Sequence, residues 1–311
     1  MKVVVLGADG FLGSNLVSEL LRVQADITAF CYPSDRLEVL RDRGVEVIQG
    51  DFTRLETLDI PLEGVDWLVH LASTTTPKES VSDPKKDAAN LTASTLIFRR
   101  AVDAGVKKIL FSSSGGTVYG DAGDRPVTES EKVRPVIPYT RTKLAIEKQL
   151  TDLTNGTSTV PIVLRLGNPY GPNQYPEKGT GVITAWLRAV RDNKPLVIYG
   201  SGDRARDFFY ISDAISAMHN SLRSERARGI YNIGSGRATT LDEIIATIEE
   251  VTGRKLSVDR LVERPSDAVK VISLDSTKAL NDFGWRPVVS LSEGIALTWK
   301  WVGQGEKFSI A

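Results

Sequence analysis

The sequence predicts an α/β protein that begins with a doubly wound parallel sheet and ends in a smaller C-terminal α/β lobe. Short apolar runs alternate with amphipathic stretches along residues 1–167, and a glycine-rich turn joins the first run to the first stretch. Residues 167–181 are then rich in glycine and proline. Strands that alternate with helices favour right-handed crossovers, which produce a parallel sheet with helices on both faces.

Each strand is predicted from a short apolar run, which is typical of a buried strand. These runs are 3–6, 27–30, 45–48, 67–71, 109–112 and 160–166. Helices are predicted from apolar residues at helical spacing or from stretches without helix breakers. These stretches are 12–21, 86–104, 139–151, 182–191, 241–252 and 274–287. Gly105, Gly253 and Gly284 are suited to end three of these helices, and Thr240 is suited to cap the start of another.

Two lobes without a clear linker are expected. Residues 1–167 form the first lobe, and residues 168–311 form most of the second. Residues 208–233, approximately, are predicted to return to the first lobe.

Composition excludes several classes of function. The 311 residues contain 39 Lys plus Arg and 39 Asp plus Glu, so the formal net charge is zero. Proteins that bind nucleic acid or membrane surfaces need a net or clustered positive field, and this chain has neither. The single Cys31 fits a reducing compartment, and two distant histidines cannot complete a Cys/His metal cluster. We therefore expect no metal site. Because no apolar run reaches membrane length, we also expect a cytoplasmic protein.

The first turn has the spacing of a dinucleotide-binding loop. Gly7, Gly10 and Gly13 form G-x-x-G-x-x-G between the first predicted strand and the first predicted helix. Gly7 permits a tight turn, Gly10 allows the backbone to approach a pyrophosphate, and Gly13 allows close packing of helix on strand. The free N–H groups of a helix N-terminus then bind the anion. The first lobe is therefore predicted to be a Rossmann-type dinucleotide-binding domain.

The second predicted strand ends without a carboxylate. An acidic residue normally binds the adenosine ribose there, but this chain has Cys31 followed by Tyr32. Ser34 and Arg36 could meet a 2′-phosphate, and Arg36 could equally be a solvated surface residue. The cofactor is therefore predicted to be NAD, with NADP left open. Asp51, after the third strand, is expected either to contact the adenine or to cap a turn.

Tyr139 and Lys143 lie four residues apart in a predicted helix, and therefore on one face of it. A tyrosine with an ordinary pKa near 10 is a poor base at pH 7. A nearby ammonium and an oxidised nicotinamide both favour the phenolate, so the pair is suited to acid/base work near neutrality. Lys143 is also suited to hold the nicotinamide ribose.

Many segments, in order along nearly the whole chain, resemble the extended short-chain dehydrogenases/reductases, and among them the NAD-dependent nucleotide-sugar epimerase/dehydratase family. The matching segments are Gly7–Gly13, Gly50–Asp51, His70–Ala72, Asn90, Ser112–Gly120, Pro138–Lys143, Arg165, Asn168–Gly171, Arg206–Ala214, Arg264 with Asp267, and Gly284–Pro287.

The resemblance implies a 4-epimerase of nucleoside-diphosphate sugars, with a UDP-sugar expected. Tyr139 would remove the C4 hydroxyl proton, hydride would pass from C4 to the cofactor, and a 4-ketose would turn over before the hydride returns. Asn168, Arg206 and Arg264 would face the diphosphate, and Asp267 would orient Arg264 or touch the nucleoside. Besides the groups already named, the implied cofactor contacts are Phe11, Leu12, Phe52, Leu71, Ala72, Ser73, Asn90 and Ser112. A homodimer formed through residues 86–104 and 139–151 is also implied.

Two departures from the family pattern affect the predicted reaction. The position that usually carries a Ser or Thr near the sugar C4 oxygen is Gly115, so Ser114 is expected to replace it, with Thr117 as the next choice. Gly116-Thr117 stands where dehydratases carry an acid, which argues against dehydration. An NADPH-dependent reductase of 4-keto-deoxy-sugar nucleotides remains the alternative, and a non-catalytic cofactor sensor is a third.

Overall fold

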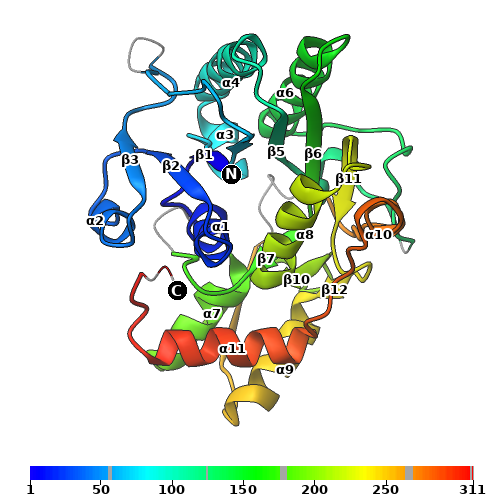
Figure 1. Cartoon of the computed structure of the whole chain (residues 1–311). Coiled ribbons are helices and arrows are strands. Elements are labelled where there is room, and N and C mark those ends of the chain that lie inside the picture. Colours follow the sequence, from blue (N-terminus) through cyan, green and yellow to red (C-terminus); the bar gives the residue numbers. More distant parts are fainter. Residues whose placement is uncertain (55–57, 124, 176–180, 263–268, 309, 311) are drawn as a thin grey trace.

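The computed structural model of the chain describes residues 1–54, 58–123, 125–175, 181–262, 269–308 and 310. Seven strands form a central sheet in the order β11-β6-β5-β4-β1-β2-β3, and every neighbouring pair is parallel (Figure 1). They are β1 (Lys2–Leu6), β2 (Asp26–Cys31), β3 (Glu46–Gln49), β4 (Trp67–His70), β5 (Lys108–Ser114), β6 (Val160–Leu166) and β11 (Gly229–Ile233). The predicted fold class is confirmed.

Side chains of β1 alternate between the two faces of this sheet, as the two-residue period of a strand requires. Val3 and Val5 join an apolar core with α1 (Phe11–Arg22) and α8 (Ile211–Arg223). Val4 and Leu6 join a second core with α4 (Lys85–Asp103) and α6 (Pro138–Thr154). Helices therefore cover both faces, α1 with α8 on one and α4 with α6 on the other (Figure 1).

The remaining elements form a smaller lobe and short connections. Its longer helices are α7 (Val182–Arg191), α9 (Leu241–Thr252) and α11 (Leu291–Gly303), and α11 packs on the other two. Three two-stranded sheets pair β7 (Asn168–Tyr170) with β10 (Phe208–Tyr210), β9 (Ala205–Arg206) with β12 (Thr239–Thr240), and β8 (Leu196–Tyr199) with β13 (Val258–Leu261). The short helices are α2 (Leu37–Arg41), α3 (Pro77–Ser82), α5 (Gly115–Val118) and α10 (Thr277–Phe283).

The interval 274–287, expected to hold a helix that stops at Gly284-Trp285, contains α10 at Thr277–Phe283. Leu274 instead forms a bridge with Val127, and Gly284, at φ +66°, ends the helix in the left-handed conformation that glycine allows. Within the described parts of the chain, no helix is both long and apolar enough to cross a membrane.

Candidate active site

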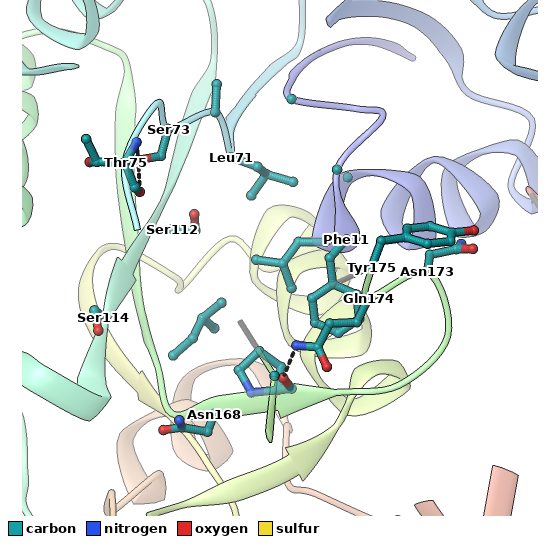
Figure 2. Close-up of a pocket in the computed structure, with 18 of the residues that line it drawn as sticks. Phe11, Leu71, Ser73, Thr75, Ser112, Ser114, Asn168, Asn173, Gln174 and Tyr175 are labelled. Carbon is teal, nitrogen blue, oxygen red and sulfur yellow. Dashed lines mark hydrogen bonds between the residues drawn. The ribbon is translucent and has the colours of Figure 1, made fainter. Parts of the chain in front are cut away.

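A cleft of about 1500 Å³ opens at the carboxyl ends of the central strands and is lined by both lobes. The order β4-β1-β2 places the point where strand order reverses between β1 and β4, which is where open α/β sheets bind ligands. Figure 2 shows Ser112 and Ser114 on one wall, with Gln174 and Tyr175 on the other. The predicted site residues that line this cleft are Gly7, Gly10, Phe11, Leu12, Gly13, Tyr32, Ser34, Arg36, Asp51, Phe52, Leu71, Ala72, Ser73, Ser112, Ser114, Tyr139, Lys143, Asn168 and Arg206.

The glycine loop has the geometry of a pyrophosphate cradle. Gly7 adopts φ +78°, and its N–H donates to the Phe30 carbonyl at 2.8 Å, so the turn is tied to β2. A Cβ built on Gly13 would lie 2.1 Å from the Gly7 carbonyl oxygen, so only glycine lets α1 begin this close to the loop. Among the described residues, no side chain caps the N-terminus of α1. Its first N–H groups are therefore available to an anion, and the loop fits a dinucleotide.

Tyr139 and Lys143 lie in the first turns of α6, beside the end of β5. The Lys143 Nζ donates to the Ser112 carbonyl oxygen at 3.0 Å and lies 5.6 Å from the centre of the Tyr139 ring. Burial lowers the pKa of Lys143 to about 8, against the opposing effects of Glu147 and Asp87. Burial and the Asp87 charge raise the pKa of Tyr139 to about 12. The protein alone therefore keeps Tyr139 protonated, and a cation in the cleft is needed to favour its phenolate.

A buried ion pair that the sequence analysis did not identify lies directly behind Lys143. Glu147 follows Lys143 by one helical turn, and its carboxylate accepts two-pronged hydrogen bonds from Arg165, the shortest 2.7 Å. Both side chains are about 95% buried, at 4% and 5% exposed. Arg165 also donates to the Tyr119 hydroxyl at 2.9 Å, and Glu147 accepts from Ser113. The network fixes α6 against β5 and β6, and thereby fixes the position of Lys143.

Replacing Glu147 by Ala should lower the free energy of unfolding by about 3–5 kcal/mol, because it leaves the Arg165 guanidinium buried without its partner. Urea unfolding followed by circular dichroism measures this. Lys148→Ala is the matched control, since Lys148 pairs with Asp152 through exposed side chains and its loss should cost under about 1 kcal/mol. A loss below 1 kcal/mol for Glu147→Ala would contradict the assignment.

A second buried polar cluster holds the loop that follows β4. Asp87, which is 3% exposed, accepts hydrogen bonds from the hydroxyls of Thr75, at 2.6 Å, and of Ser80. Asn90 accepts from the Thr74 N–H and hydroxyl and donates to the Thr75 hydroxyl. Asn90 was predicted as a cofactor contact, but it does not line the described cleft and instead anchors the loop that does.

The structure distinguishes the two hydroxyls proposed to replace the family Ser or Thr. Ser114 ends β5 and lines the cleft, whereas Thr117 lies in α5 and is not among the lining residues described. Their hydroxyl oxygens are 2.9 Å apart. A Cβ on Gly115 would lie 2.8 Å from the Arg165 carbonyl oxygen, so a Ser or Thr at that position would require the backbone to move. Ser114 is therefore better placed to reach a ligand, with Thr117 behind it.

At the β2 end of the cleft, the predicted groups have partners within the protein. The Ser34 hydroxyl donates to the Asp9 carboxylate at 3.1 Å, and the Arg36 guanidinium lies 4.2 Å from the centre of the Tyr175 ring. Asp51 accepts from the N–H and hydroxyl of Thr53, the arrangement of a turn cap, while still lining the cleft.

Two of the three residues expected to face the diphosphate lie within the described part of the chain. Asn168 begins β7 and Arg206 ends β9, and both line the cleft. Arg206 donates to the carbonyl oxygens of Val269, at 2.6 Å, and Lys270, at 3.1 Å. The predicted Arg264 and Asp267 lie outside the described residues.

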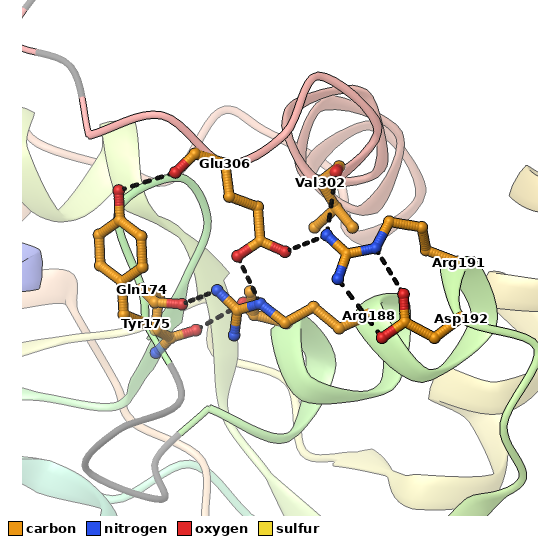
Figure 3. A network of polar contacts seen from close by, with 8 residues as sticks. Gln174, Tyr175, Arg188, Arg191, Asp192, Val302 and Glu306 are labelled. Atoms are coloured by element: carbon orange, nitrogen blue, oxygen red, sulfur yellow. Dashed lines mark hydrogen bonds and ion pairs between the residues drawn. The ribbon is translucent and has the colours of Figure 1, made fainter.

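A polar network supports the far wall of the cleft and went unrecognised in the sequence. Glu306, after α11, forms ion pairs with Arg188 and Arg191 of α7 (Figure 3). Arg188 donates to the Gln174 carbonyl at 2.7 Å, and the Tyr175 hydroxyl donates to the Glu306 carbonyl at 3.1 Å. The C-terminal segment thereby holds both lining residues in place.

Comparisons with known proteins agree with this geometry. The model of the NAD dependent epimerase/dehydratase family matches residues 3–234. The chain is 33% identical over 302 residues to the dTDP-4-dehydro-6-deoxyglucose reductase of Escherichia coli, covering 94% of this chain and 95% of that protein. The structure of the UDP-glucose 4-epimerase of Thermotoga maritima with UDP-glucose has a TM-score of 0.88 and 28% identity, and the match covers 99% of this chain and 100% of that one.

The Thermus thermophilus UDP-glucose 4-epimerase in complex with NAD is similarly related. Its structure has a TM-score of 0.87 and 30% identity, and the match covers 97% of this chain and 99% of that one. Sequence, fold and the glycine-loop cleft thus agree, and the chain belongs to the NAD dependent epimerase/dehydratase family of enzymes.

Proposed function

We propose that this protein is a nucleoside-diphosphate-sugar 4-epimerase that uses NAD, with a UDP-sugar as substrate. The observation that carries the proposal is the position of the Tyr139–Lys143 pair, in one cleft with the glycine loop on one side and with Asn168 and Arg206 on the other. NAD, when bound, accepts the hydrogen of the sugar C4 and returns it.

The chain's own groups supply the proton transfer and the positioning. Tyr139 takes the proton of the C4 hydroxyl, and the Lys143 ammonium, close to the Tyr139 ring, stabilises the phenolate. Ser114 donates a hydrogen bond to the C4 oxygen. Asn168 and Arg206 hold the diphosphate, for which the guanidinium fork is well suited. The proposed nucleotide contacts of Arg264 and Asp267 complete this side.

The distribution of acids argues against a dehydratase. The carboxylates among the described residues that line the cleft are Asp9, Asp35 and Asp51. All three follow β1, β2 or β3, on the other side of the switch point from β5, which ends at Ser114. No described lining group near Tyr139 is therefore suited to expel a hydroxyl as water.

A reductase of 4-keto-deoxy-sugar nucleotides is the second candidate, favoured by the likeness to the Escherichia coli reductase. Two assays of the purified protein separate the candidates. One follows UDP-glucose by NMR, and the other follows NADPH absorbance with a 4-keto-6-deoxy sugar nucleotide. The epimerase should form UDP-galactose with no net absorbance change at 340 nm. Stoichiometric loss of NADPH with a 4-keto-6-deoxy sugar nucleotide, without epimerisation, would establish the reductase instead. UDP-N-acetylglucosamine is the second substrate to test.

We further infer two lobes. Residues 1–167 form the first and residues 168–311 form most of the second, while about 208–233 return to the first lobe, as the parallel pairing of β11 with β6 supports.

A homodimer through α4 and α6 is inferred from their adjacent position on one face of the sheet. Light scattering after gel filtration should give twice the chain mass of 34.0 kDa. The single cysteine supports a cytoplasmic location.

A further inference from the structure

Asp9, in the middle of the glycine loop, lies over the end of β2. Leu6 and Phe30 are register partners in β1 and β2, and the Gly7 N–H donates to the Phe30 carbonyl, so the loop crosses directly to the neighbouring strand. There the Asp9 carboxylate accepts the Ser34 hydroxyl at 3.1 Å. Burial and the Asp9 charge raise the pKa of the buried Cys31 thiol to about 12.

This is the place where dinucleotide-binding folds need a carboxylate. An acid at the end of the second strand ordinarily accepts hydrogen bonds from the adenosine ribose 2′-hydroxyl. Here the strand ends at Cys31, which carries no charge at neutral pH. The Asp9 carboxylate reaches the same strand end from the glycine loop, is only partly buried and lines the cleft.

We propose that Asp9 supplies the missing ribose carboxylate and makes the cofactor site select NAD over NADP. This inference rests on the proposed function, because it assumes that the glycine loop binds a nicotinamide dinucleotide. A carboxylate accepts hydrogen bonds from a ribose hydroxyl but repels a 2′-phosphate, so one group provides both the attraction and the discrimination.

Among the described residues that line the cleft, one cation lies at this end. Lys143 lies at the acid/base pair, Lys86 on α4, and Arg204 and Arg206 in the smaller lobe, which leaves Arg36 among the described cations. The Arg36 guanidinium lies 4.2 Å from the centre of the Tyr175 ring and 5.7 Å from that of Phe308. The guanidinium thus packs on the aromatic wall formed by Tyr175 and Phe308, while the Ser34 hydroxyl is hydrogen-bonded to Asp9.

The test is dinucleotide binding, measured without turnover. Dinucleotide released by denaturing the purified protein is identified by mass spectrometry, and the protein freed of nucleotide is titrated with NADH and with NADPH by isothermal calorimetry. The wild type should release NAD and bind NADH at least tenfold more tightly than NADPH. D9N keeps the shape of the side chain but removes its charge. It should lower this preference by about tenfold, mainly by strengthening NADPH binding.

D35N is the matched control, because Asp35 is an exposed carboxylate of the same cleft end. It makes the same charge change, and the preference should stay within about twofold of wild type. Equal binding of both dinucleotides by the wild type, an unchanged preference in D9N, or an equal shift in D35N would each overturn the assignment of Asp9. If the wild type binds neither dinucleotide, the proposed function fails together with it. NADH binding without a role for Asp9 would leave the function standing.

Discussion

Replacing Tyr139 by Phe should reduce kcat by about 10²- to 10⁴-fold, the contribution usual for a positioned acid/base group. The substitution removes only the phenolic oxygen and keeps the ring, which lines the cleft with its centre 5.6 Å from the Lys143 Nζ. Because burial and the Asp87 charge raise the Tyr139 pKa to about 12, the phenolate depends on Lys143 and on a bound cation. Steady-state kinetics with the nucleotide sugar measure the loss.

Tyr231→Phe is the matched control for this prediction. It removes a hydroxyl that donates to the Asp282 carboxylate at 2.8 Å and accepts from the Arg228 N–H at 2.9 Å, and Tyr231 is not among the residues described as lining the cleft. Its loss should cost about 1–3 kcal/mol of stability and leave kcat within about twofold. NADH affinity should be nearly unchanged in Tyr139→Phe, which separates loss of chemistry from loss of cofactor. A Tyr139→Phe enzyme with a kcat within tenfold of wild type would rule out the acid/base role.

Elements with strong local signals were predicted closely. The bounds 241–252 were predicted from Thr240 and Gly253, and α9 has those bounds, with Thr240 and Glu243 capping each other and Gly253 ending the helix at φ +66°. The six predicted strands are all present, because a continuous apolar run between breakers has few alternatives to a buried strand.

The sequence was less informative about contacts between side chains that are far apart along the chain. Glu147 and Arg165 are 18 positions apart, and their pairing becomes visible only when α6 is laid against β6. A signal was nevertheless present, since Tyr139, Lys143 and Glu147 recur every four residues and must share a helix face. The same holds for Asp9 and Ser34, which are 25 positions apart. The sequence revealed the missing acid at Cys31, but only the register of β1 on β2 brings Asp9 to that strand end.

The Ser114–Thr117 alternative shows how a short motif can leave a site undecided. Counting back from Tyr119 gives Gly115, whereas counting forward from the strand end gives Ser114. A bend at the glycine pair would allow the hydroxyl of either Ser114 or Thr117 to reach the substrate. The backbone at Gly115 packs against Leu274 and the Arg165 carbonyl, and these contacts determine how the glycine pair bends. Both partners are remote from Gly115 in sequence. Ser114 then faces the cleft. We therefore expect the substrate oxygen to be met by Ser114.

Replacing Gly13 by Ala should weaken NADH binding by roughly 100-fold and lower stability by about 1–3 kcal/mol, the usual cost of overpacking. The new Cβ would lie 2.1 Å from the Gly7 carbonyl oxygen and 2.6 Å from the Ala8 Cα. Both are backbone atoms of the glycine loop, so the clash cannot be relieved by rotating a side chain. Either α1 or the loop must move, and the N–H groups that receive the pyrophosphate move with them.

The same substitution elsewhere should have the opposite effect on stability. Gly303 is the last residue of α11, and a Cβ built there meets nothing within 4 Å. Gly303→Ala should therefore be neutral or stabilising by up to about 1 kcal/mol, because alanine loses less backbone entropy in a helix than glycine. Calorimetric titration with NADH and urea unfolding of both variants provide the comparison. If Gly13→Ala binds NADH as tightly as Gly303→Ala does, the close approach of α1 to the loop is not what forms the dinucleotide site.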